Sequence, residues 1–562
     1  MIISFLGLSI ISLVILGFSS ILKNLISINK DKIRDFDFIL GILFISFISI
    51  LANFFIELNK ISYFIIFFGI ILFFYSFYKK KIEIKLKYFF FILFLFCFFT
   101  HDNGLNYDSP FYHLQIIKWS NEHVIPFGLI NLEQRYAMPS VWHTFLSTFS
   151  FSIYKFNPVY LISLIPFSFL LNQSLSEKNF KKLSSLFLII YNIFLLGFSL
   201  IHPFEDGIIF NHLGSPESDI IGIVFFGFSF YFFLRIIENN NIIDFYYLLI
   251  FVFFGILTKI SYIYLLFLLF SSIWFLKYKI FENNKLIIFL IFMTLIWFAR
   301  NLIISGCLIF PISITCFEFP WSNNIELVEY FFKEAKSWSR ATRDRAQAGN
   351  FAYTLESFKW FLPWFKDYFL NTSILKILSV SFLFLILSYI YNFIFKTKIV
   401  LYFDFNIKNS LIILFLIFGF FIWMQSPEVR YGHGLIISII VLNSILVIKL
   451  IDIEKFINTI FLKTLAIIIL VFICVKNYDV TKKFKNTFTR NFDYTHFTLI
   501  NTVNGFDIFS PPAGALAISD YHKFCGDFSG ICGYQNHPTG IQDDLTISLT
   551  KFGNYYFKRI KK

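Results

Sequence analysis

Long apolar segments recur along the chain and predict its fold class. The first runs from about Ile2 to Leu25, and the third ends before the lysines at 79–81. Each is long enough to cross a hydrocarbon core about 30 Å thick as a helix. Later segments begin near Ser184, Asp219, Ile243, Ile260, Leu286, Ser373, Leu411, Gly434 and Leu462. We therefore expect an all-α, polytopic transmembrane bundle of about 14 helices.

The composition agrees with a membrane protein and excludes a soluble globular one. Of the 562 residues, 57% are hydrophobic and only 15% are charged, and the mean hydropathy is +0.71. The formal charge is +13, and most lysines lie in short loops beside the apolar segments. Lysines in such loops orient membrane helices, so we expect no nucleic acid among the partners.

Loop charge predicts which side of the membrane each loop faces. The basic loops at 23–37 and 79–87 are expected in the cytoplasm, because cytoplasmic loops carry an excess of Lys and Arg. This orientation places the N-terminus, the polar stretch from His101 to about Ser140, and the tail after Val475 outside. The first segment has no basic n-region and no small-residue cleavage site, so we interpret it as a retained helix.

Three regions follow from this organisation. We expect N-terminal transmembrane helices over 1–87, a transmembrane catalytic core over 88–476 and an extracytoplasmic segment over 477–562. Between Val141 and Asn172 there is room for two short crossings split at Asn157-Pro158, but the charge pattern requires an odd number. We expect one crossing there and one helix at the outer interface.

The first outer stretch carries the strongest candidate chemistry. An acidic residue at the water interface of a polytopic protein is costly unless it is solvated or used, which makes Asp108 and Asp102 candidate catalytic residues together with His113. The residues from Tyr112 to Trp119, including Gln115, have the spacing of an amphipathic helix lying along the membrane. Tyr112 and Gln115 are substrate-site candidates. Interfacial anchoring is the alternative for Tyr112, Trp119 and Trp142, but anchoring needs no carboxylate.

The second outer loop ends in Ser215-Pro216-Glu217-Ser218-Asp219 at the start of an apolar segment. This pattern is also an ordinary helix start, with Ser215 or Ser218 as the N-cap and acids favoured by the helix dipole. Glu217 and Asp219 are therefore either helix-start residues or part of a substrate site.

Four cations are candidates for binding a donor phosphate. Arg300 and Arg430 each lie at the end of an apolar segment, and Lys259 is the only cation in a turn assigned to the outside. Arg135 lies in the first outer stretch. The planar guanidinium of Arg grips phosphate oxygens with two hydrogen bonds, so these residues suit a phosphate-bearing lipid. Anchoring to lipid headgroups is the alternative for Lys259, Arg300 and Arg430.

Six cysteines divide into three groups. Cys525 and Cys532 lie in the short outer tail, where an oxidising compartment favours a disulfide, with free thiols or a partial metal site as alternatives. A second outer pair consists of Cys307 and Cys316. The remaining two lie inside apolar segments, where we expect inert packing: Cys97 and Cys474.

Several of these features together resemble the GT-C class of integral-membrane glycosyltransferases, and more closely an uncharacterised bacterial branch found among surface-polysaccharide functions. The resemblance spans roughly residues 88 to 435. It lies in Asp108 with Tyr112-His113-Leu114-Gln115, Asn131-Leu132 with Arg135, Ser140-Val141-Trp142, Ser215-Pro216 with Asp219, Arg300-Asn301 with Ser305-Gly306 and Pro311, and Pro427 with Arg430-Tyr431.

The resemblance implies transfer of a sugar from a polyprenyl-phosphate carrier to a glycan, lipid or protein acceptor on the outer face of a bacterial cytoplasmic membrane. In that class an acid of the first outer loop is the catalytic base, a role that falls here on Asp108. The class commonly has two acids adjacent or one apart, whereas Asp102 and Asp108 are six apart. This departure leaves the use of a divalent metal, Mg or Mn, open.

Three other functions compete with this interpretation. One is a purely structural membrane scaffold, in which Asp108 can be replaced without consequence. A glycan polymerase or ligase also binds a polyprenyl diphosphate through outer-face Arg residues, but it does not need Asp108 as a base. A glycan-lipid transporter would place charges at mid-membrane and show inverted repeats, and the sequence has neither.

Overall fold

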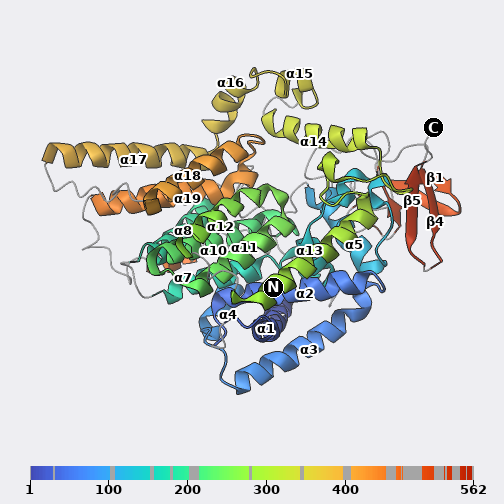
Figure 1. The fold of residues 1–562 in the computed structure, drawn as a ribbon, viewed down its shortest axis with the longest axis horizontal. Helices are drawn as coiled ribbons and strands as arrows, with labels where there is room; N and C mark the ends of the chain where they lie inside the picture. Colours follow the sequence, from blue (N-terminus) through green and yellow to red (C-terminus); the bar gives the residue numbers. More distant parts are fainter. Residues whose placement is uncertain are drawn as a thin grey trace.

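In the computed structural model, the description of the chain covers residues 2–28, 32–100, 108–151, 157–177, 182–201, 214–276, 282–341, 347–395, 407–450, 464–469, 471–472, 497–511, 525, 528, 530–533, 545–551 and 553–559. Figure 1 shows a mostly helical molecule, with the strands gathered at one end and α17 reaching toward the other.

The N-terminal helices form a close-packed group. They are α1 (Ile2–Leu25), α2 (Phe38–Asn53), α3 (Leu58–Tyr78) and α4 (Leu86–Thr100), and α1 packs against the other three. A Cβ atom added to Gly17 would lie 2.1 Å from the carbonyl oxygen of Gly69. The backbones of α1 and α3 therefore touch at these glycines, as small residues permit in membrane helix pairs.

The first outer stretch folds into short helical pieces. A π-helical turn over Ser109–His113 leads into α5 (Leu114–Glu122), and 3₁₀ turns follow at Leu129–Asn131 and Gln134–Ala137. Contrary to the expectation of a helix lying on the membrane, every residue of α5 from Leu114 to Asn121 is buried within the protein. Its polar face is covered by the C-terminal tail. The aromatic residues that were alternatives for interfacial anchoring are buried as well: Tyr112, Trp119 and Trp142.

The segment with the ambiguous crossing number contains two short helices. These are α6 (Val141–Thr148) and α7 (Leu164–Ser176), joined by a stretch with a 3₁₀ turn at Pro158–Tyr160. α6 packs against α2 and α5, whereas α7 packs against α4 and α8 (Leu183–Ile201). Both helices are shorter than the roughly 20 residues that a full crossing needs.

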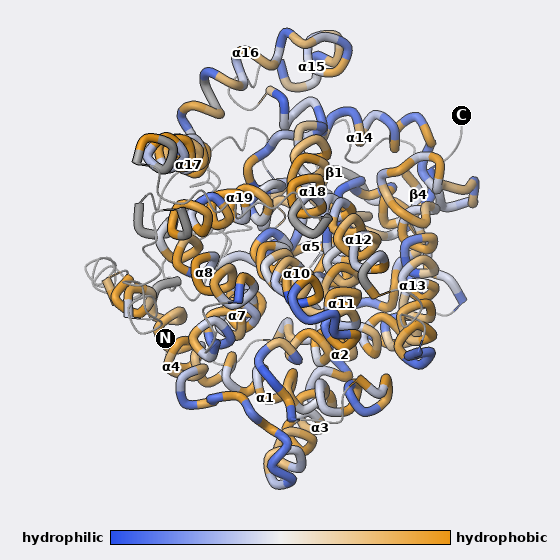
Figure 2. Tube along the Cα trace, turned by 60° about the vertical axis from the view of Figure 1, so that its left-hand side comes forward, coloured by the Kyte–Doolittle hydropathy of each residue, from blue (hydrophilic) through white to orange (hydrophobic). Residues whose placement is uncertain are grey.

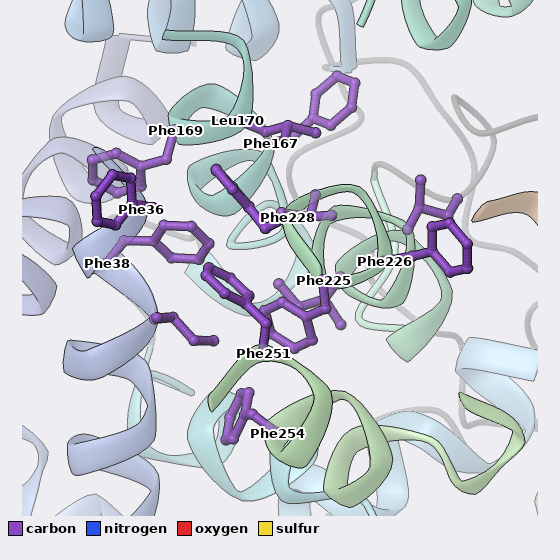
Figure 3. Close-up of a cluster of buried hydrophobic side chains, with 14 of the residues drawn as sticks. Phe36, Phe38, Phe167, Phe169, Leu170, Phe225, Phe226, Phe228, Phe251 and Phe254 are labelled. Carbon is purple, nitrogen blue, oxygen red and sulfur yellow. The ribbon is translucent and has the colours of Figure 1, made fainter. Parts of the chain in front are cut away.

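The central helices surround α10 (Ser218–Asn239), which is buried along almost its whole length. Around it lie α11 (Ile242–Thr258), α12 (Leu266–Leu276) and α19 (Val429–Leu450), and α13 (Asn284–Ser305) lies further out. Phenylalanines fill the space between these helices and α2 (Figure 3), with the rings of Phe38 and Phe169 stacked at 5.2 Å and those of Phe228 and Phe251 at 4.9 Å. The many Phe residues thus serve packing.

Among the described residues, a long connection after α13 contains three helices and leads to two more. In it, α14 (Ile325–Arg340) is amphipathic, and the short α15 (Phe351–Thr354) and α16 (Phe361–Pro363) precede α17 (Ser373–Phe395) and α18 (Ile407–Trp423). α17 packs along α19 and leaves its other side exposed.

Seven helical segments of the described chain are long and apolar enough to cross a membrane: α1, α2 with the 3₁₀ turn before it (Asp35–Asn53), α3, α10, α13, α17 and α19. Five shorter apolar helices accompany them, at Leu86–Phe98, Leu183–Gly197, Ile242–Thr258, Ile260–Trp274 and Ser410–Trp423. Figure 2 shows apolar residues along most of the helices, with polar residues mainly at helix ends and in loops. The chain is therefore a helical membrane protein.

The tail adds strands, so the expectation of an all-α fold is wrong for this part. β1 (Thr498–Val503) pairs antiparallel with β2 (Phe506–Ser510), and β2 pairs parallel with the two-residue β3 (Ile531–Cys532). β4 (Leu545–Leu549) and β5 (Tyr555–Arg559) form a second antiparallel pair. Residues of β2 to β5 share a hydrophobic cluster with α5 and the first outer stretch, which explains why α5 is buried.

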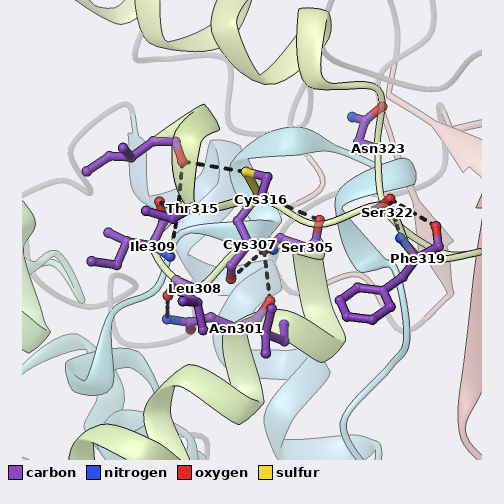
Figure 4. Close-up of a disulfide and its surroundings, with 12 residues drawn as sticks. Asn301, Ser305, Cys307, Leu308, Ile309, Thr315, Cys316, Phe319, Ser322 and Asn323 are labelled. Carbon is purple, nitrogen blue, oxygen red and sulfur yellow. Dashed lines mark hydrogen bonds between the residues drawn. A yellow bond between two sulfur atoms is a disulfide. The ribbon is translucent and has the colours of Figure 1, made fainter.

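Two disulfides are present among the described residues. Cys525 is bonded to Cys532 in the tail, and Cys307 is bonded to Cys316 just after α13 (Figure 4). These are the two pairs that the sequence suggests. Cys97 is free and buried in α4, whereas Cys474 lies outside the described residues.

Candidate functional site

Two ion pairs meet beside one tyrosine. The Arg430 guanidinium, in the first turn of α19, binds the Asp108 carboxylate, and Lys259 after α11 binds Asp219 in the first turn of α10. The Lys259 Nζ lies 4.4 Å from the centroid of the Tyr431 ring, and the Arg430 guanidinium carbon lies 5.3 Å from it. The fold therefore gathers residues from four separate loops of the sequence into one charged cluster.

The Asp108 carboxyl group is ionised in this arrangement. Burial by itself raises its pKa, but the Arg430 guanidinium and, to a smaller degree, His113 outweigh burial and hold the pKa below its usual value. Burial lowers the pKa of His113 despite the nearby carboxylates, so its imidazole is neutral at pH 7. The cluster therefore holds an ionised carboxylate next to a neutral imidazole.

Hydrogen bonds tie the first outer stretch to the start of α10. The Ser109 hydroxyl donates to Glu217 Oε1 at 3.3 Å and also bonds the hydroxyl of Ser215. Neither serine at 215 or 218 is the N-cap of α10, because Glu217 occupies that position without a side-chain capping bond. Asp219 pairs with Lys259, the single cation of its turn, and belongs to the charged cluster.

Arg300 differs from the other cations of the site. Its residue is 3% exposed, yet no carboxylate pairs with it and its Nε has no hydrogen-bond partner within the described chain. His143 lies between this arginine and the charged cluster: its ring is 4.7 Å from that of His113, and the Arg300 charge contributes, after burial and His113, to a lowered pKa of His143. Since a buried cation without a counter-ion is costly, an anion is expected to bind here.

Several buried polar atoms in the segment from Gln134 to Thr144, which includes His143, have no hydrogen-bond partner within the described residues. Both ring nitrogens of His143 and both amide atoms of Gln134 lack a hydrogen bond within the described part of the chain. The same holds for the hydroxyls of Ser140 and Thr144 and for the Trp142 indole nitrogen. Buried polar groups in proteins are almost always satisfied, so a run of exceptions indicates a place for water or a polar ligand. Hydroxyl groups suit these donors and acceptors.

Other predicted site residues lie elsewhere. The Gln115 side chain donates to the carbonyl oxygen of Cys525 at 3.3 Å, so it contacts the tail. Arg135 binds Glu133 at 3.1 Å and lies near Glu334, which gives it carboxylate partners of its own. Tyr112 is buried with its ring 4.2 Å from that of His113, at the edge of the cluster. Asp102 lies outside the described residues.

Sequence reasoning missed His143 and Tyr431 as site residues. His143 follows Trp142 in the first turn of α6, directly after the first outer stretch. A polar aromatic residue in the first turn of a helix is a signal that its side chain faces the preceding loop. Tyr431 follows Arg430 and had only that neighbour as a signal.

Within the described residues, no group of three or more His, Cys, Asp or Glu side chains is arranged to hold a metal ion.

The fold and this cluster define a polytopic helical membrane protein with a buried, charged site. The chain belongs to the family described as a domain of unknown function, DUF8201, whose model matches residues 1–437. No curated protein and no solved structure matches it. The matched range holds both ion pairs and Arg300, whereas the β strands of the tail lie beyond it.

Proposed function

We propose that this protein is an integral-membrane glycosyltransferase with a GT-C-like core of about 14 crossings. It would move a sugar from a polyprenyl-phosphate carrier to a glycan, lipid or protein acceptor on the outer face of a bacterial cytoplasmic membrane. The observation that carries the proposal is an ionised carboxylate, Asp108, held by Arg430, together with a second arginine, Arg300, that is buried with no anion partner within the described residues.

The carboxylate supplies the base for such a transfer. The acceptor hydroxyl loses its proton to Asp108 while its oxygen forms a bond to the anomeric carbon of the sugar. The bond between that carbon and the phosphate oxygen breaks, and its electron pair stays on the phosphate. No further reactant is needed.

The cations divide between two tasks. Arg430 and Lys259 are each neutralised by a carboxylate, so they hold Asp108 and Asp219 in place. Arg300 has no such partner in the described part of the chain, and its positive charge is therefore the one available to the lipid phosphate as negative charge develops on it. The unpartnered polar atoms beside His143 suit the sugar hydroxyls.

Replacement of the base tests the proposal. Asp108→Asn keeps the size of the side chain but removes the proton acceptor, so we expect transfer to fall by about 100-fold or more. Transfer would be measured with purified protein and a panel of polyprenyl-phosphate sugars. Asp219→Asn is the matched control, because it also removes one ion pair of the cluster but leaves the base in place. It should cost much less.

Two outcomes would contradict the proposal. If Asp108→Asn transfers sugar at the wild-type rate, Asp108 is not a base, and a glycan polymerase or ligase becomes the better interpretation. If both variants lose activity equally, the carboxylates act only by holding the cations.

A further inference from the structure

A second polar site lies at the other end of the central helices. A cavity opens between the end of α1, the turn at Asp35–Asp37, the end of α10 and the start of α11. Its polar lining consists of Lys23, Arg34, Arg235, Asn241, Asp244 and Tyr247.

This cavity is separate from the charged cluster around Asp108. Asp219 lies in the first turn of α10 and Arg235 in its last turns, and 16 residues of helix at 1.5 Å each separate them by about 24 Å. α11 spans about the same distance in the opposite direction: Asp244 in its first turn lies beside the cavity, and Lys259 just after its last turn lies in the cluster. The two sites therefore lie near opposite ends of the same two helices. By the loop charges, the cavity faces the cytoplasm.

The cavity lining carries three cations and one carboxylate. Lys23 is bound by the buried Asp37 at 2.7 Å, and Arg235 is bound by Asp244 at 3.0 Å. Among the described residues, Arg34 forms an ion pair only with Glu83, and this pair is weak because both side chains are about half exposed. The guanidinium of Arg34 keeps most of its N–H groups for a ligand.

Two further features point to an anion that also carries a hydrogen-bond donor. The cavity lies at the N-terminus of α11, where Asn241 caps the helix and unpaired backbone N–H groups favour negative charge. The Asp244 side chain is only 3% exposed, and its Oδ2 has no hydrogen-bond partner within the described residues. A buried carboxylate oxygen of this kind requires a donor.

The size of the cavity limits the ligand. Its volume is about 50 Å³, several times the roughly 10–15 Å³ that a single water needs. It can hold a phosphate group, whereas the rest of a larger molecule would extend out of the opening.

We propose that this cavity binds a phosphoester whose neighbouring hydroxyl or ammonium group donates to Asp244. Arg34 and Arg235 bind the phosphate oxygens, and the positive end of α11 adds to their attraction. A phospholipid headgroup and a soluble phosphoester, such as glycerol phosphate, share this chemistry.

Thermal unfolding of the full-length protein in two settings distinguishes these sources. The first compares nanodiscs of phosphatidylcholine with nanodiscs that also contain phosphatidylglycerol, and the second adds glycerol phosphate to the protein in detergent. The test variant is Arg34→Gln. Its loss of the ion pair with Glu83 should cost little stability, because both side chains of that pair are exposed to solvent. The control is Lys79→Gln, which removes an exposed cation outside the cavity lining.

We expect a higher unfolding temperature with phosphatidylglycerol or with glycerol phosphate, and we expect Arg34→Gln but not Lys79→Gln to lose that increase. A response to phosphatidylglycerol alone supports a lipid ligand, and a response to glycerol phosphate supports a soluble one. The proposal is overturned if neither compound raises the unfolding temperature, or if Arg34→Gln responds as wild type does.

Discussion

Arg300 and Arg430 should respond in opposite ways to the same substitution. Methionine is close to arginine in length and keeps most of its apolar packing, but it has no charge. Arg300 is 3% exposed and has no anion partner among the residues that the structure describes, so Arg300→Met removes an uncompensated buried cation. Replacing a buried ion pair by apolar side chains of similar volume is often neutral or stabilises a protein by up to about 4 kcal/mol, and within the described residues Arg300 lacks even the attraction that offsets burial in such a pair. We expect a gain in this range.

Arg430→Met should be destabilising. This substitution leaves the Asp108 carboxylate without its partner, and an unsatisfied buried polar group costs about 1–3 kcal/mol. The low end of that range applies because the two side chains are 26% and 17% exposed, so water screens the stranded charge in part. The two variants should therefore lie on either side of wild type in unfolding free energy.

The assay is thermal unfolding of the purified protein followed by tryptophan fluorescence, with and without an added polyprenyl monophosphate. The phosphate should raise the unfolding temperature of wild type, because it supplies the anion that Arg300 lacks. Arg300→Met should unfold at a higher temperature than wild type yet gain nothing from the phosphate. The reasoning is refuted if Arg300→Met unfolds at a lower temperature, as Arg430→Met does, because Arg300 would then have a structural partner.

Three further predictions concern the tail and the outer stretch. Burial and the Lys118 charge lower the pKa of His123 to about 4. The stability that its neutral form contributes is therefore complete above pH 6.5 and is lost as the pH falls toward 4. The unfolding temperature should decline over this range, and His123→Gln should flatten the decline. Cys532→Ser should loosen the loop whose carbonyl oxygens bind Lys118 and Tyr136, and the tail should then be proteolysed faster. An unchanged rate of proteolysis would mean that packing alone holds the loop. Arg135→Gln should lower the unfolding temperature because it removes the ion pairs with two glutamates. Transfer from a polyprenyl-phosphate sugar should persist in this variant. A loss of transfer would place Arg135 in the donor site.

The sequence by itself determined the membrane class, the helical character and most of the residue types that carry chemistry. Hydropathy over about 20 residues and loop charge are local properties, so they can be read along the chain. Asp108, Arg300 and Arg430 were recognised in this way, because an ionised group beside an apolar segment is costly wherever the chain folds.

Only the tertiary structure decided how those charges pair. Asp108 and Arg430 are 322 residues apart and Lys259 and Asp219 are 40 apart, and nothing in local sequence determines which carboxylate reaches which cation. The structure also covers α5 with the strands of the tail, so an amphipathic pattern that suits a membrane surface instead faces protein. Hydrophobic patterning requires that an apolar face be buried, but it does not determine what buries it.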